Sequence, residues 1–358
     1  MLNESGVLSG SPIVGLRARL SEAWKRRGPL ALVKYRRSFP AGTPPRGKAA
    51  LHGAAHAALA DAIALEQRGE GDTAATAFAQ AVGLFSRAGD RPGAARACLM
   101  SARCALRLGH LETAREAADA ARLAFSLLDD PANEAAALRL LGRLEVRQDN
   151  LQGARDHYDA ALDLLSITGD EAAQAAVLRT LGDIDTRLGK VHVARFELEN
   201  ALRLYETRRD TLGRARTLQS LGDLARGQSE PGLATECYRK ALPLLDSLGD
   251  TAGTAQLHLD LARLAADQAD PDDALRHAVE ATRLYEILDQ PIGRAHALYL
   301  TALASLQQRD VTTARVLARR AHDLYRTHHE DALAQTVEAL LMHLRPLRAP
   351  DTVEAARG

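Results

Sequence analysis

The sequence of 358 residues contains 46 Lys and Arg and 46 Asp and Glu, so its formal net charge is zero. Aromatic residues make up only 4% of the chain, with a single tryptophan, which indicates packing by Ala and Leu instead of one bulky core. No stretch reaches the roughly 18 apolar residues of a membrane span, and no signal-peptide pattern is present, so we expect a cytoplasmic protein.

Residues 1–48 form a basic arm. They carry ten Lys or Arg against two acids, a net charge of +8, whereas the remainder carries 36 basic and 44 acidic residues, a net of −8. Ile13, Leu16, Leu20 and Trp24 are spaced as on one face of a short amphipathic helix. This arm either caps the region that follows or contacts an acidic protein surface or an anionic membrane, and we expect no specific binding to nucleic acid.

A forty-residue repeat organises residues 49–345. Its units end near residues 90, 130, 170, 210, 250, 290 and 330, each on an acidic or amide side chain. Two columns hold alanine in every unit: Ala74, Ala114, Ala154, Ala194, Ala234, Ala274 and Ala314, and Ala81, Ala121, Ala161, Ala201, Ala241, Ala281 and Ala321. A third column holds Ala or Gly throughout, from Ala62 to Ala302. A fixed period of this size predicts a stacked array.

Each unit is predicted to be a helical hairpin. In residues 171–210, apolar side chains recur at steps of three and four in two stretches that Gly189 divides, which is the pattern of two amphipathic helices. After the seventh unit, residues 331–345 have the pattern of one more amphipathic helix, which we expect to cap the stack. Residues 346–358 are predicted to be a C-terminal tail.

These residues resemble the tetratricopeptide repeat family, in a forty-residue form. The family's Leu-Gly pair matches Leu141-Gly142, Leu181-Gly182 and Leu221-Gly222, and its inter-helix glycine matches Gly69, Gly109 and Gly189. Asp149-Asn150, Ser229-Glu230 and Ala269-Asp270 depart from that glycine. The resemblance implies an all-α, right-handed superhelical solenoid of seven hairpins plus the capping helix. It also implies that the first helices of the hairpins line a concave groove for a peptide or partner segment.

The sequence holds no recognisable catalytic motif: no phosphate-binding loop, zinc-protease helix or serine-nucleophile elbow. His52 and His56 have a spacing that suits a metal ion, but no third ligand lies near them in the sequence. Cys98, Cys104 and Cys237 form no disulfide or metal pattern. We therefore predict a protein that is not an enzyme and has no cofactor and no metal site.

Arginines recur at the positions that the resemblance places in the groove. Arg139, Arg143 and Arg147 share one helical face, because each is four residues from the next. The predicted groove residues are Arg96, Arg103, Arg107, Arg139, Arg143, Arg147, Arg179, Asp183, Arg187, Arg216, Gln219, Asp223 and Arg226. Guanidinium groups pair bidentately with carboxylate or phosphate, so we expect an acidic or phosphorylated peptide as the ligand.

The sequence thus predicts a scaffold or adaptor that binds an acidic segment of another protein. The alternative is a peptide-sensing regulatory domain of a bacterial signalling or transcription-control system, since forty-residue arrays of this kind occur there. The high Ala and Arg content is typical of a bacterial protein with a GC-rich genome.

Overall fold

The computed structural model describes residues 47–344, and these residues form fifteen α-helices and no strand. The predictions for residues 1–46 of the basic arm and for the tail 346–358 lie outside the described residues. The described residues divide into two compact units, residues 47–189 (unit 1) and 190–344 (unit 2). None of the helices in residues 47–344 has the length and hydropathy needed to cross a membrane.

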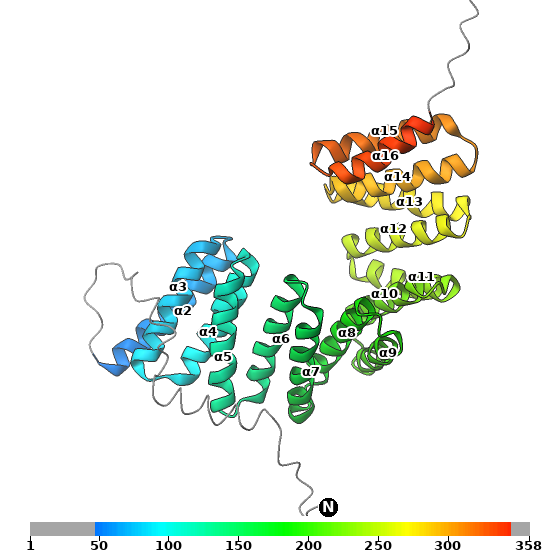
Figure 1. The fold of residues 1–358 in the computed structure, drawn as a ribbon. Coiled ribbons are helices and arrows are strands. Elements are labelled where there is room, and N and C mark those ends of the chain that lie inside the picture. The colour runs from blue at the N-terminus through cyan, green and yellow to red at the C-terminus, as the bar shows by residue number, and fades with distance from the viewer. Residues whose placement is uncertain (1–46, 345–358) are drawn as a thin grey trace, which may run out of the picture. The chain divides into compact units, whose positions relative to one another are not determined.

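Unit 1 contains three hairpins followed by a single helix, each consecutive pair packed side by side (Figure 1). The hairpins pair α2 with α3, α4 with α5, and α6 with α7. The bounds are α2 Lys48–Gln67, α3 Gly71–Ala88, α4 Arg91–Leu108, α5 Leu111–Leu127, α6 Pro131–Arg147, α7 Leu151–Thr168 and α8 Glu171–Arg187.

Unit 2 begins with a single helix, continues with three hairpins and ends with another single helix. The hairpins pair α10 with α11, α12 with α13, and α14 with α15. The bounds are α9 Val191–Thr207, α10 Thr211–Gly227, α11 Pro231–Leu248, α12 Thr251–Asp267, α13 Pro271–Ile287, α14 Pro291–Gln307, α15 Val311–Thr327 and α16 Asp331–His343. The prediction of an all-α stack of hairpins is confirmed.

The acidic column that closes the repeats caps the helices that follow it. In each of five units the Asp side chain accepts a hydrogen bond from the backbone N–H three residues on, at 2.9 to 3.1 Å: Asp90, Asp130, Asp170, Asp210 and Asp250. This bond satisfies one of the backbone donors that a helix N-terminus leaves unpaired. Gln290 and Glu330 make no such side-chain bond.

The turns keep a left-handed residue even where glycine is replaced. Gly69, Gly109 and Gly189 have φ of 81°, 81° and 73°. Asp149, Ser229, Ala269 and Arg309 occupy the same column with φ of 58°, 57°, 57° and 66°. The departures from the family's glycine therefore leave the turn geometry unchanged and place L-residues in a conformation that costs them roughly 1 to 2 kcal/mol.

The two alanine columns form the centre of the core, because every one of their members is completely buried. The third small column makes room for aromatic rings on second helices. A Cβ placed on Gly142 would lie 2.6 Å from Cε2 of Tyr158, and one on Gly222 would lie 2.4 Å from Cε1 of Tyr238. Both tyrosines are nearly fully buried, so glycine is required at these positions to admit the rings.

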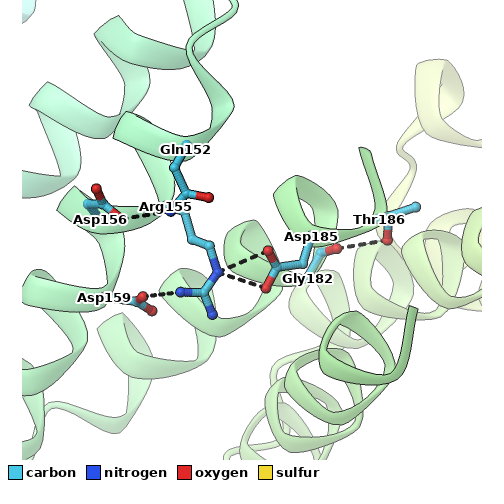
Figure 2. A network of polar contacts seen from close by, with 7 residues as sticks. All are labelled: Gln152, Arg155, Asp156, Asp159, Gly182, Asp185 and Thr186. Atoms are coloured by element: carbon cyan, nitrogen blue, oxygen red, sulfur yellow. Dashed lines mark hydrogen bonds and ion pairs between the residues drawn. The ribbon is translucent and has the colours of Figure 1, made fainter. Parts of the chain in front are cut away.

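Neighbouring hairpins of unit 1 are also joined by ion pairs. Arg155 on α7 donates from Nε to both oxygens of Asp185 on α8, at 2.9 and 3.0 Å, and also binds Asp159 one turn along its own helix. Figure 2 shows Arg155 reaching across between these helices. One repeat earlier, Arg115 donates to Oε1 of Glu145 at 2.6 Å. Burial would raise the pKa of Glu145, but hydrogen bonds from Arg115 and Asn150 lower it below its usual range.

Candidate functional site

Four of the predicted groove arginines in unit 1 have no ion pair with a carboxylate among residues 47–344: Arg96, Arg103, Arg139 and Arg143. Arg96 and Arg103 lie on α4, Arg139 and Arg143 lie on α6, and Arg139 is partly buried while the others are exposed. These charges are therefore available to an anionic ligand.

Arg139, Arg143 and Arg179 all act electrostatically on Tyr158. Burial raises the pKa of Tyr158, while the positive charges of Arg143, Arg139 and Arg179 act to lower it. Tyr158 extends from α7, and its ring lies against Gly142 of α6. Arg179, on α8, also binds Asp183 at 2.9 Å. Two arginines of α6 and one of α8 thus act on a single tyrosine of α7.

The remaining unit 1 positions are engaged within the protein. Arg107 binds Glu66 at 2.9 Å, and Arg187 binds Asp149 at 2.7 Å. Arg147 donates to the backbone carbonyl of Leu106 at 2.6 Å. Each bond joins a first helix to the hairpin before it, so these arginines also hold neighbouring hairpins together.

The predicted groove residues of unit 2 lie among groups of opposite charge. Arg216 lies 4.0 Å from Asp250 and Arg226 lies 3.9 Å from Asp223, which also accepts a hydrogen bond from the Tyr238 hydroxyl at 2.7 Å. Gln219 is partly buried on the same helix, α10. Opposite charges are therefore balanced at these positions.

The network continues into α12 through a carboxylate that sequence reasoning missed. Asp260 accepts hydrogen bonds from Gln256 at 3.2 Å, and Gln256 in turn accepts one from Tyr285 at 3.0 Å. Burial and the charge of Asp223 raise the pKa of Asp260 to about 6. Burial and the charge of Asp260 raise the pKa of Tyr285 to about 12. The feature of the sequence that could have revealed this carboxylate is that Asp260 is an acidic residue among the apolar residues of α12.

The prediction of no metal site rested on a missing third ligand beside His52 and His56. The structure supplies one, because Asp90 places Oδ2 within 3.0 Å of His52 Nε2 although the two residues are 38 positions apart. The premise of that prediction is therefore wrong.

A model of the tetratricopeptide repeat family matches residues 59–126, 99–176 and 259–329, which together make up more than half of the chain. No curated protein sequence matches significantly.

Solved structures with a similar fold include the apo form of RapI, with 14% identity, a TM-score of 0.62, and coverage of 77% of this chain and 99% of that one. A Rap protein complexed with competence and sporulation factor has 9% identity and a TM-score of 0.52, over 82% of this chain and 98% of that one. A signal transduction ATPase with a tetratricopeptide repeat sensor, from Pyrococcus horikoshii, has 14% identity and a TM-score of 0.55. The match covers 75% of this chain and 42% of that one.

At these identities the structural likeness concerns the fold. It agrees with the family match and with the forty-residue hairpins, left-handed turns and buried alanine columns described above. The chain belongs to the tetratricopeptide repeat family.

Proposed function

We propose that this protein is a non-catalytic interaction scaffold that binds an acidic or phosphorylated segment of a partner protein along the first helices of unit 1. The observation that carries the proposal is that Arg139 and Arg143 lie one turn apart on α6 with no ion pair to a carboxylate among residues 47–344, and that both act, together with Arg179, on Tyr158. Like charges gathered in this way repel one another, and an anionic ligand would relieve the repulsion.

The chemistry of these groups matches carboxylate or phosphate. Each guanidinium presents a planar fork of donors that can hold two oxygens of one anion, and the phenol adds a further donor. Arg139 and Arg143 do not first have to break an internal ion pair, since none joins them to a carboxylate among residues 47–344. Arg96 and Arg103 on α4 extend the same positive charge toward the N-terminal hairpin.

The balanced charges of unit 2 suit a ligand of mixed character. Arg216, Gln219, Asp223 and Arg226 offer both donors and acceptors, so we assign them to polar contacts with a segment of mixed character. We place the protein in the reducing cytoplasm of a bacterium, because the three cysteines are free and buried. An acidic protein surface or an anionic membrane is the proposed contact of the basic arm.

A second candidate is a peptide-sensing regulatory domain. It is favoured by the fold likeness to a Rap protein that was solved with competence and sporulation factor and to an ATPase whose repeats are described as a sensor. In that case the ligand is a short free peptide, and its binding changes the arrangement of the hairpins. A scaffold instead holds a segment of a folded partner without such a change.

The test is a titration of fluorescent peptides, rich in Asp and Glu or phosphorylated, against the wild type and the triple variant Arg139→Ala/Arg143→Ala/Arg179→Ala. Charged hydrogen bonds contribute roughly 1.5 to 3 kcal/mol each, so the triple change is expected to weaken binding at least about tenfold, which takes only about 1.4 kcal/mol. The matched control replaces Arg203, Arg319 and Arg320, three exposed arginines on second helices.

The control removes the same net charge, so equal weakening in both variants would indicate general attraction and contradict a specific site. Binding of basic and neutral peptides alone would contradict it as well. Small-angle scattering with and without a bound peptide separates the two candidates, because only a sensor changes its dimensions.

A further inference from the structure

Three side chains with metal-binding groups meet at the start of unit 1. His52 and His56 lie one turn apart on α2, and Asp90 is the residue that caps α4. One ligand atom from each residue lies within 4.8 Å of the other two. Two imidazoles and one carboxylate are a donor set that Zn²⁺ binds in proteins, with water at an open fourth position.

Contacts outside the cluster already orient both the carboxylate of Asp90 and the two histidine rings. The Oδ1 atom of Asp90 accepts the Gly93 N–H at 2.9 Å, which leaves Oδ2 directed at His52. The rings of His52 and His56 both pack edge-on against Phe85, with centroids 6.1 and 5.0 Å away, and Phe85 is completely buried. Such supporting contacts set the direction of a ligand before the metal arrives.

The remaining adjustment is small. Tetrahedral coordination at about 2.0 to 2.2 Å separates ligand atoms by roughly 3.3 Å, so the widest present separation has to close by about 1.5 Å. Rotation of the two histidine side chains supplies this movement, because both residues are exposed. The same exposure gives the ion a path of entry.

We propose that His52, His56 and Asp90 form a binding site for a zinc-class divalent cation that joins α2 of the first hairpin to α4 of the second. The ion replaces the hydrogen bond between His52 and Asp90 with coordination to both. Because the ligands come from two hairpins, only the folded chain presents all three of them. Bound metal therefore stabilises the N-terminal end of the array by mass action.

The experiment is a calorimetric titration of Zn²⁺ into the full chain without a histidine tag. The wild type is expected to bind one ion per chain. His56→Ala removes a ligand from an exposed position, and Asp90→Asn removes the carboxylate charge while keeping a side chain that caps helices well. Each variant is expected to weaken binding at least tenfold, and zinc is expected to raise the thermal midpoint of the wild type but not of these two variants.

The matched control is His328→Ala/His329→Ala, which removes two exposed histidines from another part of the chain and is expected to bind zinc like the wild type. X-ray absorption at the zinc edge should show imidazole and carboxylate ligands. The proposal is overturned if His52→Ala/His56→Ala binds zinc as tightly as the wild type, which would place the ion elsewhere, for example at the pair formed by the partly buried His258 and the buried His277. It is also overturned if the wild type shows no saturable binding in the micromolar range.

Discussion

Arg155 on α7 is bound through Nε to both carboxylate oxygens of Asp185, the residue thirty positions further along on α8. The same separation joins Arg115 to Glu145 one repeat earlier. A second-helix arginine therefore reaches the first helix of the following hairpin at a fixed offset. Asp185 is completely buried, so its charge depends on this partner.

Arg155→Ala is expected to lower the free energy of unfolding by about 3 kcal/mol, because it removes a charged partner from a buried carboxylate. Urea denaturation followed by circular dichroism measures the change. Arg155→Met combined with Asp185→Leu is expected to recover most of it, since both charges are then absent. A loss below about 0.5 kcal/mol, as expected for the exposed Arg203→Ala, would show that the pair contributes little.

Gly142→Ala is expected to destabilise the protein by about 1 to 3 kcal/mol, because the new methyl group would overlap the ring of Tyr158. This outweighs the gain of up to about 1 kcal/mol in helix propensity. Gly227→Ala is the control, since no atom lies within 4 Å of a Cβ there, and it should be neutral or stabilising. Thermal unfolding compares the two, and equal midpoints would contradict the assigned packing.

Ala269→Gly is expected to stabilise the protein by up to about 1 kcal/mol, because Ala269 has a φ of 57° that glycine adopts without strain. The reverse change, Gly109→Ala, should destabilise by a similar amount. Gly109 has a φ of 81° and open space around it, so backbone strain alone acts there. Both changes are read from the midpoint of chemical denaturation, and a loss of stability in Ala269→Gly would refute the argument.

Asp260→Asn is expected to remove a pH dependence of stability. The folded state raises the pKa of Asp260 to about 6, so this state holds a proton that the unfolded state releases between pH 4 and 6. Stability from this group is therefore full below about pH 4 and is lost as the pH rises through about 6, by on the order of 2 to 3 kcal/mol.

The effect of Asp260 has to be measured as the difference in stability between the wild type and Asp260→Asn at each pH. Burial and the nearby His258 lower the pKa of His277 to about 4, which makes stability rise with pH over the same interval. Unfolding midpoints at pH 4 and pH 7 are expected to differ between the two proteins in the direction given. Parallel curves would show that Asp260 titrates normally.

The hairpins followed from the sequence because the repeat fixes which faces are apolar. The columns through Ala74 and Ala81 are completely buried, and the closing aspartates are helix caps. Local spacing determines both features, so the period of forty residues was sufficient to find them.

The candidate sites were only partly predictable, because they depend on side chains that differ from repeat to repeat. The arginines of α6 were visible as a pattern, but Tyr158 was not, since its column varies in the other units, which hold Phe78, Ala118, Leu198, Tyr238, Ala278 and Ala318. Asp90 was recognised as the end of a unit and not as a neighbour of His52. Contacts of this kind are set by how helices of different hairpins cross, which the period alone does not specify.

Because Arg155 and Asp185 are thirty residues apart, as are Arg115 and Glu145, a duplicated repeat would keep its ion pairs to the repeats on either side. If residues 131–170 were duplicated in place, the first copy of Arg155 would meet the second copy of Glu145, and the second copy of Arg155 would still meet Asp185. The new junction would also carry its own capping aspartate, a copy of Asp170. Duplication of this whole repeat therefore lengthens the array while keeping both the ion pair between consecutive repeats and the helix cap at the junction.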